Sequence, residues 1–290
     1  MIRLAACQYA IELHETWAAY AEHLRGLCRQ AADAGAQVLL LPEYAGLVLS
    51  GQLPTAQRSD LVGSIAAVQP LLGHWLALCE EIARTLGVYL QPGSLPVLDA
   101  DGRYRNRAWL FGPEGRLGFQ DKLMMTRFER EQWRIDAGQG VKVFETPLGR
   151  LGILICYDNE FPMLARRLAE GGADLILAPS CTDTEAGYHR VRIGAQARAL
   201  ENQIAVLQSP TVGMAPWSPA LDENIGRAGL FVPPDHGMPG DGVVAVSAEL
   251  SPQGSQWLIA DLDLEAVRRV RREGQVFLRR DWPEQFERLG

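Results

Sequence analysis

The chain has 290 residues, of which 47% are hydrophobic and 22% are charged, as in an ordinary globular protein. Its net charge of −7 argues against nucleic acid as a partner, because phosphate binding requires a clustered basic surface. The longest apolar runs, such as VLLL and LILA, are far shorter than the ~20 residues of a membrane span, so no membrane partner is expected.

The cysteine content indicates a reducing environment. The N-terminal stretch MIRLAACQYAIELHE reaches acidic residues too early for a signal peptide. Five cysteines, odd in number and widely spaced, fit neither a disulfide framework nor a C-x-x-C metal site. We therefore expect a cytoplasmic protein with free thiols at Cys7, Cys28, Cys79, Cys156 and Cys181.

Strands and helices alternate in the pattern of the first part of the chain. Apolar residues at helical spacing, ended by glycine, predict a helix, whereas short apolar runs stopped by proline predict buried strands. The expected elements are a strand at 2–8, a helix at 15–35, a strand at 36–42 and a helix at 65–87 that Pro70 begins or kinks.

The middle of the chain is typical of hairpins, and the remainder returns to alternation. The turn signals DADG and GPEG separate three short strand patterns. The expected elements are strands at 88–98, 103–112, 116–124, 141–156, 173–179, 243–250 and 256–263, and helices at 163–172 and 189–203. The stretch 211–242 is rich in Pro and Gly, which is typical of a lid or an interface loop.

Residues 3–43 are echoed by residues 150–180. Each segment has Arg-Leu, a buried strand, a helix, and then a strand that follows Gly-Ala and ends near proline. Either βαβ units have converged on similar sequences, or the fold contains two related halves packed sheet on sheet. The second interpretation predicts an α/β fold, a four-layer α-β-β-α sandwich, formed by 1–290 as a single domain.

Cys156 closes the apolar run LGILIC, where a strand ends and a helix is expected to begin. Oriented backbone N–H groups at such a place stabilise a thiolate or an oxyanion. Burial alone raises a thiol pKa, and cysteine is a common core residue. A catalytic role for Cys156 therefore depends on charged companions.

Two charged residues follow apolar segments in the same way. Glu43 ends VLLLPE and could act as a general base if burial raises its pKa. Lys122 lies in FQDKLMM, where a buried ammonium needs an acidic partner, for which Asp121 is one candidate. A cysteine–histidine pair is a weaker alternative, because neither His189 nor His236 ends a strand.

Together these segments resemble the nitrilase (carbon–nitrogen hydrolase) superfamily. LLPEY is similar to its glutamate block, DKLMMTRFERE to its lysine block and GILICYDNEFP to its cysteine block, in the same order. The resemblance runs through nearly the whole chain, with 211–242 the least typical part. Cys-Tyr-Asp resembles the amidase branches of the superfamily rather than the true nitrilases.

The resemblance implies a thioester mechanism without a metal or organic cofactor. Glu43 would act as the base, Cys156 as the nucleophile, and Lys122 with the Tyr157 backbone N–H as the oxyanion site. A second glutamate is implied seven residues beyond the lysine, which favours Glu129 over Glu131. Asp158, Ser180 and Cys181 are further candidates for the oxyanion or substrate pocket.

The expected partner is a small-molecule substrate, and the group that is hydrolysed stays open. A small aliphatic amide is favoured, with a nitrile, an N-carbamoyl compound or a catalytically silent binding role as alternatives. Asn159 and Glu160 stand where carbamoyl amidases carry arginine. Family resemblance also implies a homodimer or a higher homo-oligomer, with the Arg-containing tail at about 264–290 at the interface.

Overall fold

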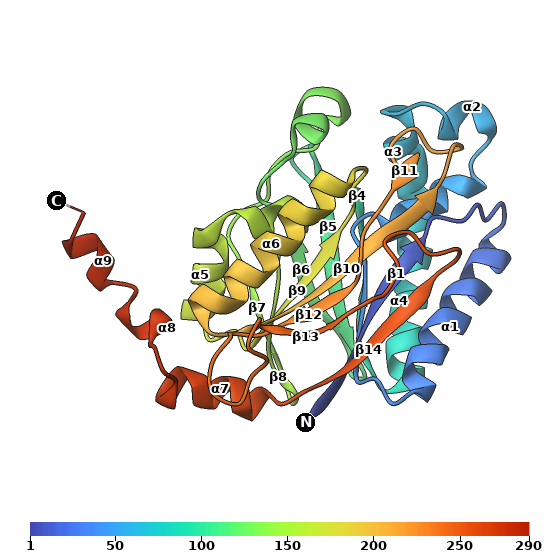
Figure 1. Ribbon diagram of the computed structural model, residues 1–290. Helices are drawn as coiled ribbons and strands as arrows, with labels where there is room; N and C mark the ends of the chain where they lie inside the picture. Colours follow the sequence, from blue (N-terminus) through green and yellow to red (C-terminus); the bar gives the residue numbers. More distant parts are fainter. Residues whose placement is uncertain (290) are drawn as a thin grey trace.

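The computed structural model describes residues 1–289, which form two β-sheets packed face to face with helices outside (Figure 1). β1 lies beside the edge strand β14 of the first sheet, with which it pairs antiparallel, and pairs in parallel with β2 on its other side. The strands of this sheet are β1 (Ile2–Ala10), β2 (Val38–Leu41), β3 (Tyr89–Pro92), β4 (Ser94–Leu98), β5 (Tyr104–Gly112), β6 (Gly115–Asp121) and β14 (Gln256–Leu262).

In the second sheet, β10 pairs in parallel with β9 and antiparallel with β12. Its strands are β7 (Val143–Thr146), β8 (Gly149–Ile153), β9 (Leu175–Ser180), β10 (Ala205–Met214), β12 (Gly229–Phe231) and β13 (Val243–Val246), and β11 (Glu223–Asn224) joins the end of β10. The last two residues of β1 pair with β10, so the two sheets are continuous at one edge.

Helices cover the outer face of each sheet and give the four layers (Figure 1). α1 (Trp17–Asp33) and α4 (Leu72–Leu86) pack on the first sheet, and α5 (Pro162–Glu170) and α6 (Glu185–Asn202) on the second. A third apolar core lies between the sheets and includes Leu4, Leu40 and Leu177, none of which is exposed. The predicted four-layer α-β-β-α sandwich is confirmed.

The two halves repeat the same local geometry. In the first, the turn after α1 contains Gly35, which has φ of +84°, and a Cβ atom there would lie 3.4 Å from the Arg3 guanidinium. In the second, Gly172 has φ of +89° and lies beside Arg150. In each half, the residue two positions after that glycine donates its N–H to the arginine carbonyl at 2.8 Å. The sequence echo therefore corresponds to two βαβ units with matching turns.

Several segments differ in detail from the expected elements. Pro70 lies in a short 3₁₀ turn, so the expected helix at 65–87 divides into α3 and α4. Thr184 caps α6 by accepting from the Gly187 N–H at 3.1 Å, so α6 begins before residue 189. The remaining short elements before the C-terminal helices are η1 (Ala45–Gln52), α2 (Thr55–Arg58), α3 (Gly63–Val68), η2 (Gln69–Leu71), the π-helical turn η3 (Glu129–Trp133) and η4 (Cys156–Glu160).

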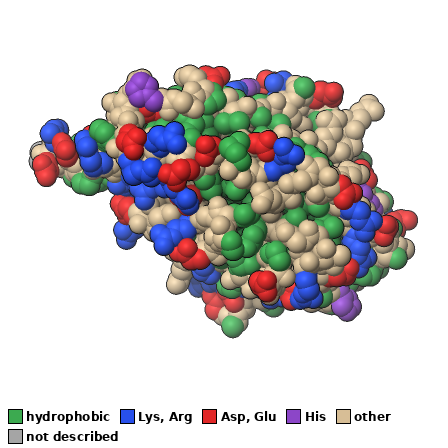
Figure 2. All heavy atoms as spheres, turned by 90° about the horizontal axis from the view of Figure 1, so that it is seen from below, with side chains coloured by type: hydrophobic (Ala, Val, Ile, Leu, Met, Phe, Trp, Pro, Cys, Tyr) green, Lys and Arg blue, Asp and Glu red, His purple; other side chains and the backbone are tan. Residues whose placement is uncertain are grey.

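The C-terminal residues form α7 (Leu264–Glu273), α8 (Leu278–Asp281) and α9 (Glu284–Glu287). α8 is held to the body of the molecule, since the Arg279 N–H donates to Gln203 at 3.2 Å, and α9 extends away from it (Figure 1). Arg268 and Arg271 of α7 pair with Asp174 at 2.7 and 2.9 Å. Basic side chains gather over α7, at the base of this extension (Figure 2). Among the described residues, no helix is long and apolar enough to cross a membrane.

Candidate active site

A cavity of about 370 Å³ brings together residues that are far apart in the chain. Glu43 follows β2, Lys122 follows β6, and Cys156 is the first residue of η4, shortly after β8. All three side chains line this cavity, and each is at most 4% exposed. The three segment ends selected from the sequence therefore meet at one place, between the two sheets.

Glu43 is held by hydrogen bonds from three directions. Its Oε1 atom accepts from Lys122 Nζ at 2.8 Å and from Asn106 Nδ2 at 2.9 Å. Its Oε2 atom accepts from the Cys181 backbone N–H at 3.0 Å. A carboxylate with this many fixed donors cannot rotate freely, so its orientation toward Cys156 is set by the fold.

The environment of Glu43 suits a general base. Burial raises the pKa of Glu43 to about 7, against the opposing effect of Lys122. Glu129 raises the pKa further, and the neighbouring Cys156 thiol lowers it as a hydrogen-bond donor. A carboxyl group with a pKa near neutrality can both accept and return a proton at physiological pH.

Lys122 is a fully buried ammonium between two carboxylates. Its Nζ atom lies 2.8 Å from Glu43 Oε1, and 2.8 and 2.7 Å from the two oxygens of Glu129. Burial alone would lower the pKa of Lys122, but Glu129 and Glu43 outweigh it and raise the pKa well above its ordinary value. Lys122 is therefore a fixed positive charge at the cavity wall.

Glu129 and Glu131 occupy different environments. Glu129 is 2% exposed and accepts from Tyr44 Oη and from both the N–H and the hydroxyl of Thr126 at 2.9 Å. Burial opposes its ionisation, but Lys122 lowers the pKa of Glu129 overall. Glu131 lies on the surface and pairs with Arg127 at 3.0 Å. Of these two glutamates, Glu129 contacts Lys122 and Glu131 does not.

Cys156 occupies a tight turn that follows strand β8 of the second sheet. Its φ of +48° is in the left-handed region, which is uncommon for a residue with a side chain. Its Sγ atom lies 3.6 Å from the Cys181 carbonyl oxygen. Burial and then Glu43 raise the pKa of Cys156 well above its ordinary value, so the resting group is a thiol that needs a base.

The turn that contains Cys156 is held in place by hydrogen bonds from Asn159 and by contact with α6. Asn159 Nδ2 donates to the carbonyl oxygens of Leu154 at 2.9 Å and Cys156 at 3.2 Å. Arg198 of α6 donates to the Asn159 carbonyl at 2.9 Å. A Cβ atom at Gly194 would lie only 2.7 Å from that same carbonyl, so α6 can approach the turn only because residue 194 is glycine.

Of the other pocket candidates, Tyr157 and Cys181 line the cavity. The Tyr157 N–H belongs to the first turn of η4, where backbone N–H groups lack partners within the helix. Asp158 and Ser180 do not line the cavity, which corrects their expected place. Asp158 is fully buried and accepts from the N–H groups of Leu123, Met124 and Ile155, and the Ser180 hydroxyl donates to the Ser209 carbonyl.

Asp158 connects the lysine segment to the cysteine turn. Its Oδ1 atom accepts from Met124 at 2.8 Å, and its Oδ2 atom accepts from Ile155 at 3.1 Å. Burial raises the pKa of Asp158 to about 7, against the effects of Lys122 and these backbone donors. Its role is structural, since it fixes the positions of Lys122 and Cys156 relative to each other.

The alternative partners considered from the sequence lie elsewhere. Asp121 pairs with Arg107 at 2.6 Å rather than with Lys122. His189 faces Glu185 on the surface of α6, and His236 hydrogen bonds to Gln275. Neither histidine lines the cavity, so the cavity that contains Cys156 has a glutamate, Glu43, and no imidazole in its lining.

Sequence reasoning missed Asn106, Tyr44 and Thr126. Asn106 is fully buried on β5 and shares the inner face of that strand with Ala108 and Leu110. A polar residue at an inward position of an alternating strand is a signal that was present in the sequence. Tyr44 directly follows Glu43 in the sequence, and Thr126 lies three residues before Glu129. No sequence pattern identifies the hydrogen bonds that Tyr44 and Thr126 donate to Glu129.

Residues 3–272 match the family model described as carbon-nitrogen hydrolase. The chain is 34% identical over 275 residues to the probable hydrolase YhcX of Bacillus subtilis, which covers 95% of this chain and 52% of that protein. The chain thus spans about half the length of YhcX. It is also 30% identical over 206 residues to omega-amidase NIT2-B of Xenopus laevis, covering 68% of this chain and 67% of the relative.

Solved structures share the fold. Nit3 of Saccharomyces cerevisiae, a member of branch 10 of the nitrilase superfamily, superimposes with a TM-score of 0.71 at 21% identity, over 93% of each chain. A carbon-nitrogen hydrolase of Helicobacter pylori gives a TM-score of 0.73 at 20% identity, over 100% of this chain and 94% of the other. This chain belongs to the carbon–nitrogen hydrolase family of the nitrilase superfamily.

Proposed function

We propose that the protein hydrolyses a small aliphatic amide to a carboxylic acid and ammonia through a thioester on Cys156. The observation that carries the proposal is the contact of Glu43 with Lys122, at 2.8 Å, in the cavity that contains Cys156. A thiol, a base of raised pKa and a fixed cation are the groups that acyl transfer requires.

In the first half-reaction, the Cys156 thiol transfers its proton to Glu43 and Sγ attacks the amide carbonyl carbon. The carbonyl oxygen becomes an oxyanion, which Lys122 Nζ and the Tyr157 N–H stabilise. When the tetrahedral intermediate collapses, the C–N bond breaks, Glu43 returns the proton to the departing nitrogen, and ammonia leaves. Cys156 is then acylated and Glu43 is ionised again.

In the second half-reaction, water replaces ammonia in the same site. Glu43 takes a proton from the water while its oxygen attacks the thioester carbon, and the same oxyanion donors act again. The C–S bond breaks, and the sulfur recovers a proton from Glu43. The overall balance is one amide and one water consumed, with one carboxylic acid and one ammonia produced.

The cavity supports a short, largely apolar acyl group. A cavity of about 370 Å³ lies near the lower end of small-ligand sites, and its wall includes Phe128, Trp133 and Val191. The arginines at its rim are already paired, Arg127 with Glu131 and Arg190 with Glu160 at 3.5 Å. This pairing disfavours an N-carbamoyl amino acid, whose carboxylate would need a free cation.

The amidase names of several relatives support an amide rather than a nitrile. They include omega-amidases of frogs, cattle, zebrafish and mouse, and a deaminated glutathione amidase of Yersinia enterocolitica. The free cysteines fit a reducing compartment such as the cytoplasm.

An ammonia-release screen tests the proposal. Matched series of short amides, nitriles and N-carbamoyl compounds are incubated with the wild type and with Cys156→Ala. We expect turnover of amides by the wild type and none by the variant. Turnover of nitriles alone would replace the amidase by a nitrilase, and an absence of turnover in all series would favour a binding role.

The outer helices support a homodimer or a higher homo-oligomer. Met163 of α5 and Ile193 and Leu200 of α6 are each more than 40% exposed on the face of the second helical layer. α9 has no buried residue, and its large apolar side chain Phe286 is 55% exposed. We therefore propose that a second copy covers this face and the C-terminal segment.

A further inference from the structure

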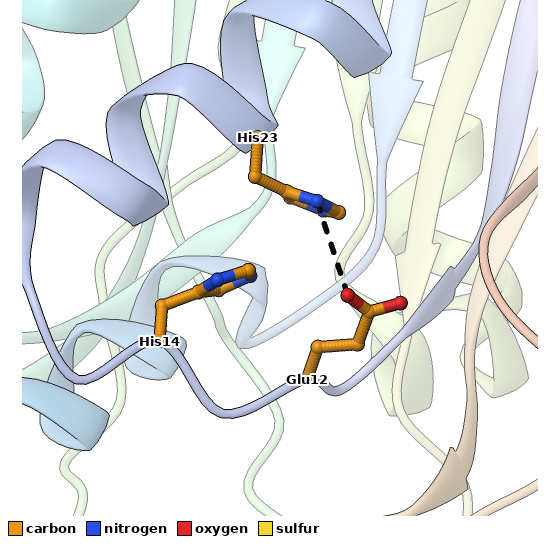
Figure 3. A group of neighbouring side chains, drawn as sticks. All are labelled: Glu12, His14 and His23. Atoms are coloured by element: carbon orange, nitrogen blue, oxygen red, sulfur yellow. Dashed lines mark ion pairs between the residues drawn. The ribbon is translucent and has the colours of Figure 1, made fainter.

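Glu12, His14 and His23 form a cluster outside the catalytic cavity (Figure 3). Glu12 and His14 lie in the segment between β1 and α1, and His23 points back from α1 toward them (Figure 3). One potential ligand atom from each side chain lies within 4.8 Å of the other two. It is the one group of three such side chains among residues 1–289.

The two histidines leave buried polar atoms without a partner. His14 Nε2 and His23 Nε2 are both inaccessible to solvent, and no group in the described part of the chain hydrogen bonds to either atom. Tyr9 is 1% exposed, its hydroxyl is also unpartnered, and its ring packs edge-on against His23 at 6.1 Å. A buried nitrogen atom without a partner costs free energy, and a ligand at His14 Nε2 would remove that cost, whereas His23 faces Glu12 through its other nitrogen, Nδ1.

We propose that Glu12, His14 and His23 bind one divalent transition-metal ion, for which zinc is the best match. Two imidazole nitrogens and one carboxylate oxygen are a donor set that zinc accepts, with water in the remaining position. Mg²⁺ and Ca²⁺ prefer oxygen ligands and would bind poorly here. The Glu12 carboxylate also offsets part of the charge of the ion.

The geometry requires only a small closure of the side chains. Glu12 Oε2 lies 3.9 Å from His23 Nδ1, and the centroids of the His14 and His23 rings are 4.6 Å apart. Tetrahedral zinc with bonds of about 2.0 Å holds its ligands about 3.3 Å apart. Glu12 is 46% exposed and is free to move inward.

The bound ion would stabilise the segment that connects β1 to α1 by linking it to the helix. Glu12 and His14 come from the connecting segment and His23 from the second turn of the helix. The same segment packs against η1, since a Cβ atom at Gly51 would lie 3.1 Å from the His14 carbonyl oxygen. η1 begins two residues after Glu43, so the bound ion would stabilise the fold beside the catalytic glutamate without entering the cavity.

The test is zinc binding to the 290-residue protein without an affinity tag. Zinc chloride is titrated into chelator-treated Cys156→Ala protein, a background that removes the reactive thiol as a competing ligand. We expect one equivalent of zinc to bind. We expect the dissociation constant to rise at least tenfold in His14→Gln, His23→Gln and Glu12→Gln, and to stay unchanged in the control His189→Gln.

Thermal unfolding provides a second readout. With free zinc at about 100 times the dissociation constant, we expect the melting temperature to rise by about 5 °C in the His189→Gln control and not in the cluster variants. Glu12→Gln changes an exposed side chain, so this variant stays informative if a histidine variant folds poorly. Weak, non-stoichiometric binding, or equal affinity in Glu12→Gln and the control, would overturn the proposal.

Discussion

The Glu43 carboxylate accepts a hydrogen bond from the backbone N–H of Cys181 at 3.0 Å. Glu43 follows β2 in the first half of the fold, and Cys181 follows the equivalent strand β9 in the second half. The contact therefore joins the two halves at the place where the proposed base meets the proposed nucleophile. The site is a product of the pairing of two βαβ units rather than of either unit alone.

The raised pKa of Glu43 predicts a particular pH profile. Because the base must be ionised, kcat/KM should rise about tenfold per pH unit at acidic pH and level off above a pKa of about 7. Glu129 should not contribute a limb in this range, since Lys122 lowers its pKa. The measurement is kcat/KM for ammonia release between pH 5 and 9, and a profile that is flat through pH 7 would contradict the role of Glu43.

Replacement of Glu43 by glutamine tests the base itself. The amide keeps the size of the side chain but cannot accept the thiol proton, so turnover should fall by about 10²–10⁴-fold. The far-ultraviolet circular dichroism spectrum should match the wild type. Near-wild-type turnover in Glu43→Gln would remove Glu43 from the mechanism.

Lys122→Ala is expected to lose both activity and stability. The variant leaves Glu43 and Glu129 buried without their cation, which should cost about 3–5 kcal/mol of unfolding free energy. The pKa values of both carboxyl groups should rise, so the loss of stability relative to the wild type should be smallest below the ordinary glutamate pKa of about 4.5 and should grow as pH increases. Urea unfolding at pH 5 and pH 8 checks this, and equal stability losses at both values would contradict it.

Glu129 and Glu131 form a matched pair for testing the second glutamate. Glu129→Gln removes the charge that positions Lys122, and we expect kcat to fall by about 10²-fold. Glu131→Gln alters only a surface pair with Arg127, so its kcat and stability should remain near the wild-type values. If both variants behaved alike, the buried contacts of Glu129 would have no catalytic consequence.

Gly194→Ala tests the brace behind Cys156. The added methyl group would lie 2.7 Å from the Asn159 carbonyl, so α6 or the cysteine turn must shift, at a cost of about 1–3 kcal/mol. We expect kcat to fall at least tenfold because the nucleophile moves. Gly26→Ala is the control: apart from the neighbouring residues of its own helix, no atom lies within 4 Å of the added methyl group, so this variant should leave kcat unchanged.

The proposed interface predicts a change in assembly on truncation. Removal of the residues after Trp282 deletes α9, which has no buried residue, and should leave the fold intact. Replacement of Ile193, which is 63% exposed, by aspartate should disrupt association more strongly. Sedimentation velocity measures both effects. A wild-type protein that sediments as a monomer would contradict the proposed oligomer.

The sequence predicted the four layers, and it identified the three segment ends that meet in the cavity, because both depend on local patterns. Apolar runs that end at Glu43, Lys122 and Cys156 are visible without knowledge of contacts. Asp158 was misplaced because helix N-termini attract acids generally, and only the fold shows that it accepts three N–H groups from two segments. The brace formed by Arg198, Asn159 and Gly194 depends on how closely α6 approaches, which no local pattern specifies.

The proposed mechanism requires that Cys156 carries the acyl group during turnover. Acid-quenched samples taken while an amide is being hydrolysed, digested and analysed by mass spectrometry, show which residue carries it. We predict that the peptide containing Cys156 gains the mass of the acyl group and that Cys156→Ala shows neither this adduct nor ammonia release. An acyl group on a different residue, or ammonia release by Cys156→Ala at the wild-type rate, would contradict the account.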